Sequence, residues 1–162
     1  MFKEKSAKPI ANGQLINDAC AIIEQAQKFA HHAVNETLVK RNWLLGMRIQ
    51  NEVLKDKRAD YGKQVVKKLS CELVKRYGGG FNQANLYHFV NFFNCFPKIF
   101  YAVSRKLENG SALQIFDAAS RKTPITLSWT HYRILLQECN ANARSWYEQE
   151  AAREVWSTRT LQ

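Results

Sequence analysis

Apolar residues recur at helical spacing along the first third of the chain. The pattern predicts a helix over residues 14–54, because one stripe continues almost without a break. Some 40 residues is long for one globular helix. A bend near Asn35–Thr37 would explain this length, and so would a long helix that pairs in a dimer. The sequence leaves both interpretations open, and the stripe comprises Leu15, Ala19, Ile22, Ile23, Ala26, Ala30, Ala33, Val34, Leu44, Leu45, Ile49 and Val53.

A second amphipathic helix is predicted over residues 61–77. Asp60 is its expected N-cap, and Gly78–Gly80 are expected to end it, because glycine adopts the positive φ values that terminate helices. Lysines and arginine lie on its polar side. The predicted buried side comprises Tyr61, Val65, Val66, Leu69 and Leu73.

A third helix is predicted over residues 82–96, directly after the glycines. Asn82 is its expected N-cap, and Phe81 just before the cap is expected to pack on Leu86. Pro97 bounds its far end. The predicted core-facing residues are Leu86, Phe89, Val90 and Phe93.

In the last part of the chain, the turn-forming residues predict loops over residues 98–127, and a pair of helices is predicted after them. Ser128 is the expected cap of a helix through about Gln137, and Asn142 that of a helix through about Val155. Ser157 is the expected cap of one more helix, which suggests a domain that normally continues into something longer. The residues predicted to face inward on the helix after Asn142 are Ala143, Trp146, Tyr147 and Ala151.

These elements predict an all-α fold. The 162 residues include only seven glycines and three prolines, too few for a many-stranded sandwich. We expect a flexible N-terminus over residues 1–13 and one helical domain over residues 14–162. Its order is a long N-terminal helical region, a core of two helices joined by a glycine turn, and a C-terminal helical pair.

The positive charge of the chain is concentrated around the glycine turn. The formal net charge is +10, and residues 40–76 hold eleven basic against four acidic groups. Residues 77–97 hold no charge of either sign, and residues 98–122 hold five basic and two acidic groups. A basic surface beside an uncharged, amide-rich helix is typical of a duplex-binding protein, because phosphate contacts supply affinity while neutral amides read bases.

Two helices joined by a short glycine turn also have the outline of a helix-turn-helix. On this hypothesis the second helix faces the bases and the first contacts phosphates. The candidate base-facing residues are Asn82, Gln83, Asn85, Tyr87, His88 and Asn91. The candidate phosphate-contacting residues are Lys63, Lys67, Lys68, Lys75 and Arg76.

The cysteines and histidines do not indicate a cofactor or a metal site. Cys20, Cys71, Cys95 and Cys139 are far apart and form no CxxC pair. His31 and His32 are adjacent, so a helix points them about 100° apart. With no secretory signal and no apolar run long enough to span a bilayer, we expect free thiols in a reducing cytoplasm.

Four separated blocks resemble one known family. The blocks are "RADYGKQVVKKLSCEL", "YGGGFNQANLYHFVNFFNCFP", "LSWTHYRILL" and "EVWSTRTLQ". In this order they are similar to the N-terminal domain of the YhcG-type family, bacterial proteins in which this domain usually precedes a PD-(D/E)XK nuclease domain. The resemblance covers about residues 14–162. It implies a helical DNA-binding module whose partner is such a nuclease domain, in cis or in trans.

The sequence departs from this family on the predicted recognition helix. Relatives commonly carry arginines near the positions that Tyr87, His88 and Val90 fill here, and arginine is the commonest specific reader of guanine. Their loss opens a second interpretation, in which Tyr87 or Phe92 stacks on unpaired bases.

We do not expect the chain itself to be an enzyme. A PD-(D/E)XK site needs a carboxylate two positions before a lysine to work beside a divalent metal, and no lysine of this sequence has one. We therefore predict a non-catalytic, helix-turn-helix-like DNA-binding module, also a homodimer, that targets an associated nuclease. The alternative is a protein-interaction and dimerisation scaffold whose basic patch is incidental.

Overall fold

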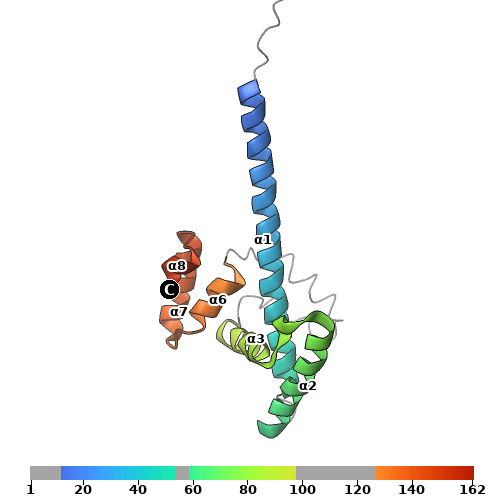
Figure 1. Cartoon of the computed structure of the whole chain (residues 1–162). Coiled ribbons are helices and arrows are strands. Elements are labelled where there is room, and N and C mark those ends of the chain that lie inside the picture. The colour runs from blue at the N-terminus through green and yellow to red at the C-terminus, as the bar shows by residue number, and fades with distance from the viewer. Residues whose placement is uncertain (1–11, 54–58, 98–126) are drawn as a thin grey trace, which may run out of the picture. The chain divides into compact units, whose positions relative to one another are not determined.

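The computed structural model describes residues 12–53, 59–97 and 127–162, and all regular structure in these ranges is helical (Figure 1). The predicted all-α class is confirmed. Residues 1–11 of the predicted flexible start and residues 98–126 of the predicted loop lie outside the described residues, and Asn12 and Gly13 are helical rather than part of a flexible start. The helices are α1 (Asn12–Val53), α2 (Ala59–Tyr77), η1 (Gly79–Phe81), α3 (Gln83–Cys95), α6 (Trp129–Leu135), α7 (Ala141–Arg153) and α8 (Thr158–Leu161).

Helix α1 is a single element of 42 residues. It is helical through Asn35–Thr37, the place of the bend that was one of the two interpretations left open by the sequence. The chain nevertheless divides into two compact units, with the boundary between Val34 and Asn35. The first unit contains the N-terminal half of α1, and the second contains its C-terminal half with all the helices that follow.

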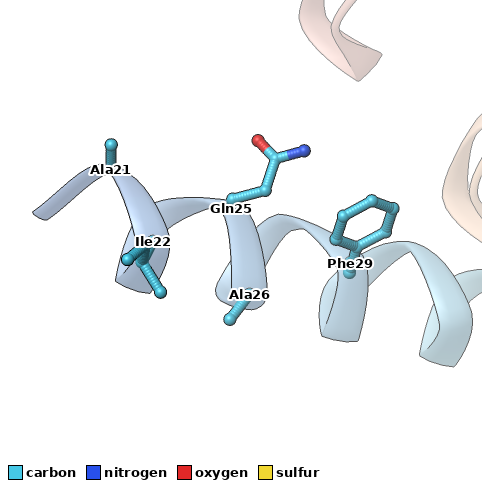
Figure 2. Close-up of a pocket in the computed structure, with 5 residues that line it drawn as sticks. All are labelled: Ala21, Ile22, Gln25, Ala26 and Phe29. Atoms are coloured by element: carbon cyan, nitrogen blue, oxygen red, sulfur yellow. The ribbon is translucent and has the colours of Figure 1, made fainter. Parts of the chain in front are cut away.

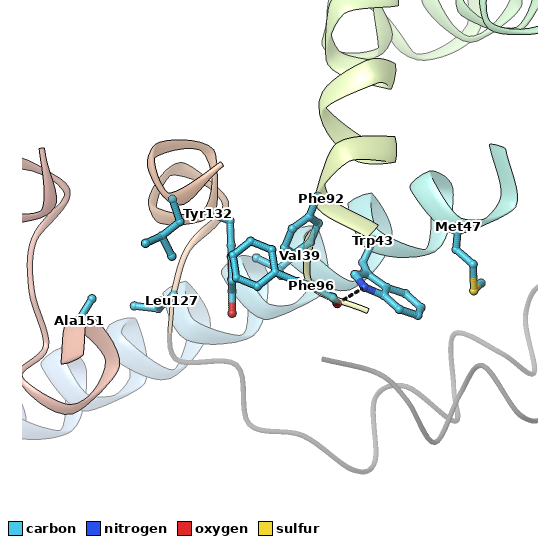
Figure 3. Close-up of a cluster of buried hydrophobic side chains, with 9 residues drawn as sticks. Val39, Trp43, Met47, Phe92, Phe96, Leu127, Tyr132 and Ala151 are labelled. Atoms are coloured by element: carbon cyan, nitrogen blue, oxygen red, sulfur yellow. Dashed lines mark hydrogen bonds between the residues drawn. The ribbon is translucent and has the colours of Figure 1, made fainter. Parts of the chain in front are cut away.

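The larger cluster of the second unit forms around aromatic side chains of α1, α3 and α6 (Figure 3). Trp43 is fully buried, and its Nε1 donates a hydrogen bond of 2.9 Å to the carbonyl oxygen of Phe96. The rings of Phe92 and Tyr132 lie 4.8 Å apart. Because the indole N–H has a partner, burial of Trp43 leaves no donor unsatisfied. The cluster comprises Val39, Trp43, Met47, Phe92, Phe96, Leu127, Tyr132, Leu135 and Ala151.

A second buried cluster joins α1 to α2 and α3, through Ile49, Val66, Leu86 and Phe89. The backbones of α1 and α3 come very close here. A Cβ atom on Gly46 would lie 1.9 Å from the carbonyl oxygen of Phe89. Only glycine fits at this crossing, so Gly46 fixes how closely α3 packs on α1.

The predicted helix, glycine turn and helix are all present. Gly78 has a φ of 88°, and its N–H donates to the carbonyl of Val74 at 2.9 Å. Asn82 caps α3 as predicted, because its side chain accepts a hydrogen bond of 2.9 Å from the N–H of Asn85. Phe81 packs against the cluster that contains Leu86, as expected.

The predicted cap of α2 is wrong. The helix begins at Ala59, so Asp60 lies in its first turn. A carboxylate there still interacts favourably with the helix dipole.

The C-terminal helices confirm two predicted caps and correct one. Ser128 caps α6, and the side chain of Ser157 accepts from the N–H of Thr160 at 3.2 Å. Helix α7 is capped by Asn140 rather than Asn142, since the Asn140 side chain accepts from the N–H of Asn142 at 2.9 Å.

The predicted inward side of α7 is also partly wrong. Ala151 is buried and Ala143 half-buried, whereas Trp146 and Tyr147 are exposed. Their rings contact each other, with centroids 5.0 Å apart. The apolar spacing predicts a buried face, but the helix fully buries only Ala151.

Candidate nucleic-acid interface

The exposed side of α2 is basic. All five predicted phosphate-contacting residues are exposed: Lys63, Lys67, Lys68, Lys75 and Arg76. They lie away from the packed side of the helix, where Val66 is buried. Cationic groups on a solvent-facing helix side can reach phosphates without first breaking core contacts.

One of these cations is partly neutralised within α2. Lys75 forms an ion pair with Glu72, with Nζ 3.1 Å from Oε1, and this hydrogen bond raises the pKa of Lys75. Both side chains are more than half exposed, so salt and solvent screen the pair. Lys75 can therefore exchange Glu72 for a phosphate at little cost.

The exposed side of α3 is uncharged. Gln83, Tyr87, Asn91 and Asn94 are exposed and follow one another at spacings of four, four and three residues. This spacing sets them on one helix face. Opposite them Leu86, Phe89 and Phe92 are buried. We call these four residues the amide stripe; Asn94 was missed by sequence reasoning, although it lies seven residues after Tyr87.

Two predicted base-facing residues serve the turn instead. The Asn82 side chain caps α3, and Asn85 donates from Nδ2 to the carbonyl oxygen of Gly80 at 3.0 Å. His88 is half-buried at the edge of the exposed face. The structure thus brings Gln83, Tyr87 and Asn91 together and leaves the other three outside the stripe.

The stacking interpretation is corrected for one residue. Phe92 is fully buried, with its ring 5.3 Å from that of Trp129, so it cannot stack on a base. Tyr87 is 44% exposed and keeps a free ring surface for stacking.

Helix α1 adds a cation beside the glycine turn. The Arg41 guanidinium lies 5.0 Å from the ring centre of Phe81 and donates from Nη2 to Oδ1 of Asn42 at 2.9 Å. Burial lowers the pKa of Arg41. This contact was not predicted, because Arg41 and Phe81 are 40 positions apart and no local pattern connects them.

Its neighbour Lys40 is positioned differently. Lys40 is 3% exposed and pairs with Glu36, with Nζ 2.5 Å from Oε1. A buried, paired ammonium does not contact phosphate. The cationic surface of this region is therefore smaller than the count of basic residues implies.

Ser128 and His131 form a close pair that works as a helix cap. Ser128 Oγ lies 2.7 Å from Nδ1 of His131, and Nε2 of His131 lies 2.9 Å from the carbonyl oxygen of Trp156. Because a carbonyl only accepts, Nε2 carries the proton and Nδ1 accepts from the serine. The pair ties α6 to the chain after α7.

Metal-binding clusters and membrane-spanning helices are both absent from the residues that the structure describes. Within residues 12–53, 59–97 and 127–162, no group of three or more His, Cys, Asp or Glu side chains is placed to hold a metal ion. None of the helices described has the length and apolar character needed to cross a bilayer. All four cysteines are free.

Comparison with known proteins gives two matches. Residues 18–162 match the model of the DUF1016 N-terminal domain. The chain is also 31% identical, over 168 residues, to the Escherichia coli (strain K12) protein named "Putative nuclease YhcG"; the match covers 94% of this chain and 44% of that protein. The chain therefore spans less than half the length of this relative. No solved structure gives a significant match.

Proposed function

The chain belongs to the DUF1016 N-terminal domain family, and on this premise we propose that it is a non-catalytic DNA-binding module. In this proposal it delivers a PD-(D/E)XK nuclease domain, in cis or in trans, to its substrate. The name of the E. coli relative supports the nuclease association. The proposal assigns phosphate contact to α2 and base contact to α3, in the manner of a helix-turn-helix.

One observation carries the proposal: a basic helix side and an uncharged amide side are joined by a short, hydrogen-bonded turn. Gly78 and the Asn82 cap fix the turn, and Asn85 anchors it from α3. Amides hydrogen-bond to base edges and lysines attract phosphates at any sequence. Together they form a surface on which affinity and discrimination come from different helices.

The non-catalytic part of the proposal rests on the sequence. None of the fourteen lysines has an acidic residue two positions before it, so the carboxylate and lysine spacing of a PD-(D/E)XK site is missing. Nuclease assay of the purified chain with Mg²⁺ tests this point. The claim that the chain is non-catalytic would be refuted by two results together: cleavage persists when Lys63, Lys67 and Lys68 are replaced, and cleavage is lost when another residue of the chain is replaced.

The direct test is a charge-removal variant of α2. Lys63→Gln, Lys67→Gln and Lys68→Gln together should weaken binding to any duplex and flatten its salt dependence, by about 0.9 in log–log slope for each phosphate that the variant no longer neutralises. The matched control is Lys28→Gln, Arg133→Gln and Arg159→Gln, which removes the same charge from exposed positions elsewhere. Equal weakening by both variants would mean that binding follows net charge alone.

A second candidate function is a protein-interaction and dimerisation scaffold. The observation that favours it is the exposed apolar surface of α1 before the unit boundary, where Leu15, Ile22 and Phe29 are each more than half exposed. The scaffold requires a defined oligomer with little affinity for DNA. Because the DNA-binding module is also expected to be a homodimer, titration with duplex DNA separates the two candidates and molecular mass alone does not.

A further inference from the structure

The N-terminal half of α1 exposes large apolar side chains along its whole length. All described side chains of residues 13–34 are exposed. An exposed apolar face of this size marks an interaction surface. The large residues are Leu15, Ile16, Ile22, Ile23 and Phe29, between 55% and 70% exposed, and Val34 at the unit boundary is 57% exposed.

These residues form a regular seam. Leu15, Ile22 and Phe29 are seven positions apart, and three alanines, Ala19, Ala26 and Ala33, repeat at the same interval between them. Figure 2 shows part of the seam, where Ile22, Ala26 and Phe29 line a shallow hollow on successive turns. A strict seven-residue repeat of apolar positions is the pattern by which one helix packs along another.

We propose that this seam, the α1 seam, binds a second copy of the same chain with the two helices antiparallel. In an antiparallel pair centred on Glu24, Ile22 faces Ala26 of the partner, Phe29 faces Ala19, and Leu15 faces Ala33. Every layer then joins one large and one small side chain, which fills the interface evenly. A parallel pair would stack alanine on alanine and leave gaps between layers of large residues.

The residues beside the seam favour the same orientation. In the antiparallel pair Ile23 lies beside Ile23 of the second copy, and Asp18 lies beside His32. Apolar groups therefore meet on one flank, and an acid meets a base on the other. In a parallel pair Asp18 would lie beside Ile23. The Asp18 carboxylate would then lose water contacts to an aliphatic side chain, which costs free energy.

Charge and area also identify a second copy as the partner. Residues 12–34 contain only Asp18, Glu24 and Lys28 as charged groups, so two copies do not repel each other here, although the whole chain carries +10. Five large side chains that bury about 100 Å² each give about 500 Å² per copy. The total of about 1,000 Å² reaches the lower limit of a specific interface.

Sedimentation without DNA tests the proposal independently of DNA binding. The chain should sediment at twice its 18.7 kDa at tens of micromolar. Ile22→Glu with Phe29→Glu should return it to 18.7 kDa with an unchanged melting temperature of the remaining helices, because both residues are exposed. The matched control, Asn17→Glu with His31→Glu, adds the same charge on the opposite side of the helix and should leave the dimer intact.

Three results would overturn it: a monomeric parent chain, a seam variant that remains dimeric, or a control variant that dissociates equally. The DNA-binding proposal is unaffected by any of them, since the seam lies before the unit boundary and the assay contains no DNA.

Orientation is tested by a spin label at Gln14, after replacement of the four native cysteines. In the antiparallel pair the two labels are offset by 20 residues, or about 30 Å along the axis. In a parallel pair the offset vanishes. An inter-label distance set by the helix separation alone would overturn the antiparallel assignment.

Discussion

Helices α2 and α3 pack in the same way and differ in what they expose. Each buries an apolar side in a cluster with α1, through Val66 of α2 and through Leu86 and Phe89 of α3. The exposed side of α2 carries lysines, whereas residues 77–97, which include all of α3, carry no charge. Packing against α1 therefore determines which residues of α2 and α3 are apolar and buried, but it does not determine whether their exposed residues are charged or neutral.

This difference suggests a division of work in DNA binding. Lysines attract any phosphate and give affinity without selectivity, while amides gain only from a base edge at the right place. The comparison predicts that changes on α2 alter affinity and changes on α3 alter discrimination. Substitutions in the buried cluster that α2 and α3 share with α1 should lower the free energy of unfolding more than they alter DNA binding by the folded protein.

The largest effect should come from the close crossing of α3 on α1 at Gly46. Gly46→Ala places a Cβ atom against the Phe89 backbone, which cannot move as a flexible side chain can. We expect a loss of more than about 4 kcal/mol in the free energy of unfolding and loss of all DNA binding. Urea denaturation measures the first. Gly80→Ala is the control, because its added Cβ meets nothing within 4 Å. An equal loss of unfolding free energy in both variants would contradict the close packing of α3 on α1 at Gly46.

A smaller loss should follow from truncation of α3 alone. Leu86 is fully buried, and Leu86→Ala should cost about 2–5 kcal/mol in the free energy of unfolding as a cavity forms. Thermal or urea unfolding measures it. At temperatures where this variant stays folded, the lysines of α2 keep their positions, so salt-dependent affinity should survive. A stability unchanged within error would show that α3 is not packed as described.

Removal of the three amide side chains of the amide stripe should leave stability nearly unchanged. Gln83→Ala, Asn91→Ala and Asn94→Ala are exposed substitutions, each expected within about 0.5 kcal/mol. Discrimination among duplex, branched and single-stranded DNA should fall more than overall affinity. Competition binding measures both. The control Gln137→Ala, Asn142→Ala and Gln149→Ala removes amides elsewhere, and the stripe has no reading role if both variants discriminate alike.

The smallest effect should arise at Glu148 of α7, which lines a pocket beside Cys95 at the end of α3. Burial raises its pKa, against the opposing effects of the Tyr132 hydroxyl at 3.2 Å and of Arg144. A carboxyl with a raised pKa in the folded state favours folding below its unfolded pKa, and that contribution is lost as the pH rises through the folded value. Stability should therefore decline slightly above about pH 4. Glu148→Gln should flatten this decline in urea unfolding at several pH values, while Glu150→Gln should not.

Local patterns predicted the parts of the candidate interface that depend on helix periodicity and capping. Asn82 was identified as a cap from its place after the glycines, and the packed side of α3 followed from the spacing of Leu86 and Phe89. Asn94 continues the same period and was within reach of that reasoning. The cap of α7 was placed at Asn142 instead of Asn140, because two asparagines near one helix start satisfy the same local rule.

Contacts between distant segments were beyond sequence reasoning. Nothing around Gly46 indicates that the Phe89 backbone lies against it, and nothing around Arg41 indicates Phe81. Burial of Lys40 is likewise a tertiary fact, whereas its pairing with Glu36, four positions earlier on α1, is local. For Trp146 and Tyr147 the error has the other direction: the helical spacing of apolar residues predicted that both are buried, and both are exposed.

The most direct test of DNA binding is a titration of the unmodified chain with duplex DNA at several salt concentrations. If α2 contacts phosphates, binding should be measurable at low salt, and log affinity should fall linearly against log salt concentration. Contacts from Lys63, Lys67 and Lys68 alone predict a slope at least as steep as about −2.7, at about −0.9 for each phosphate. Absence of binding at low salt, or an affinity that does not change with salt, would contradict the account and favour the dimerisation scaffold.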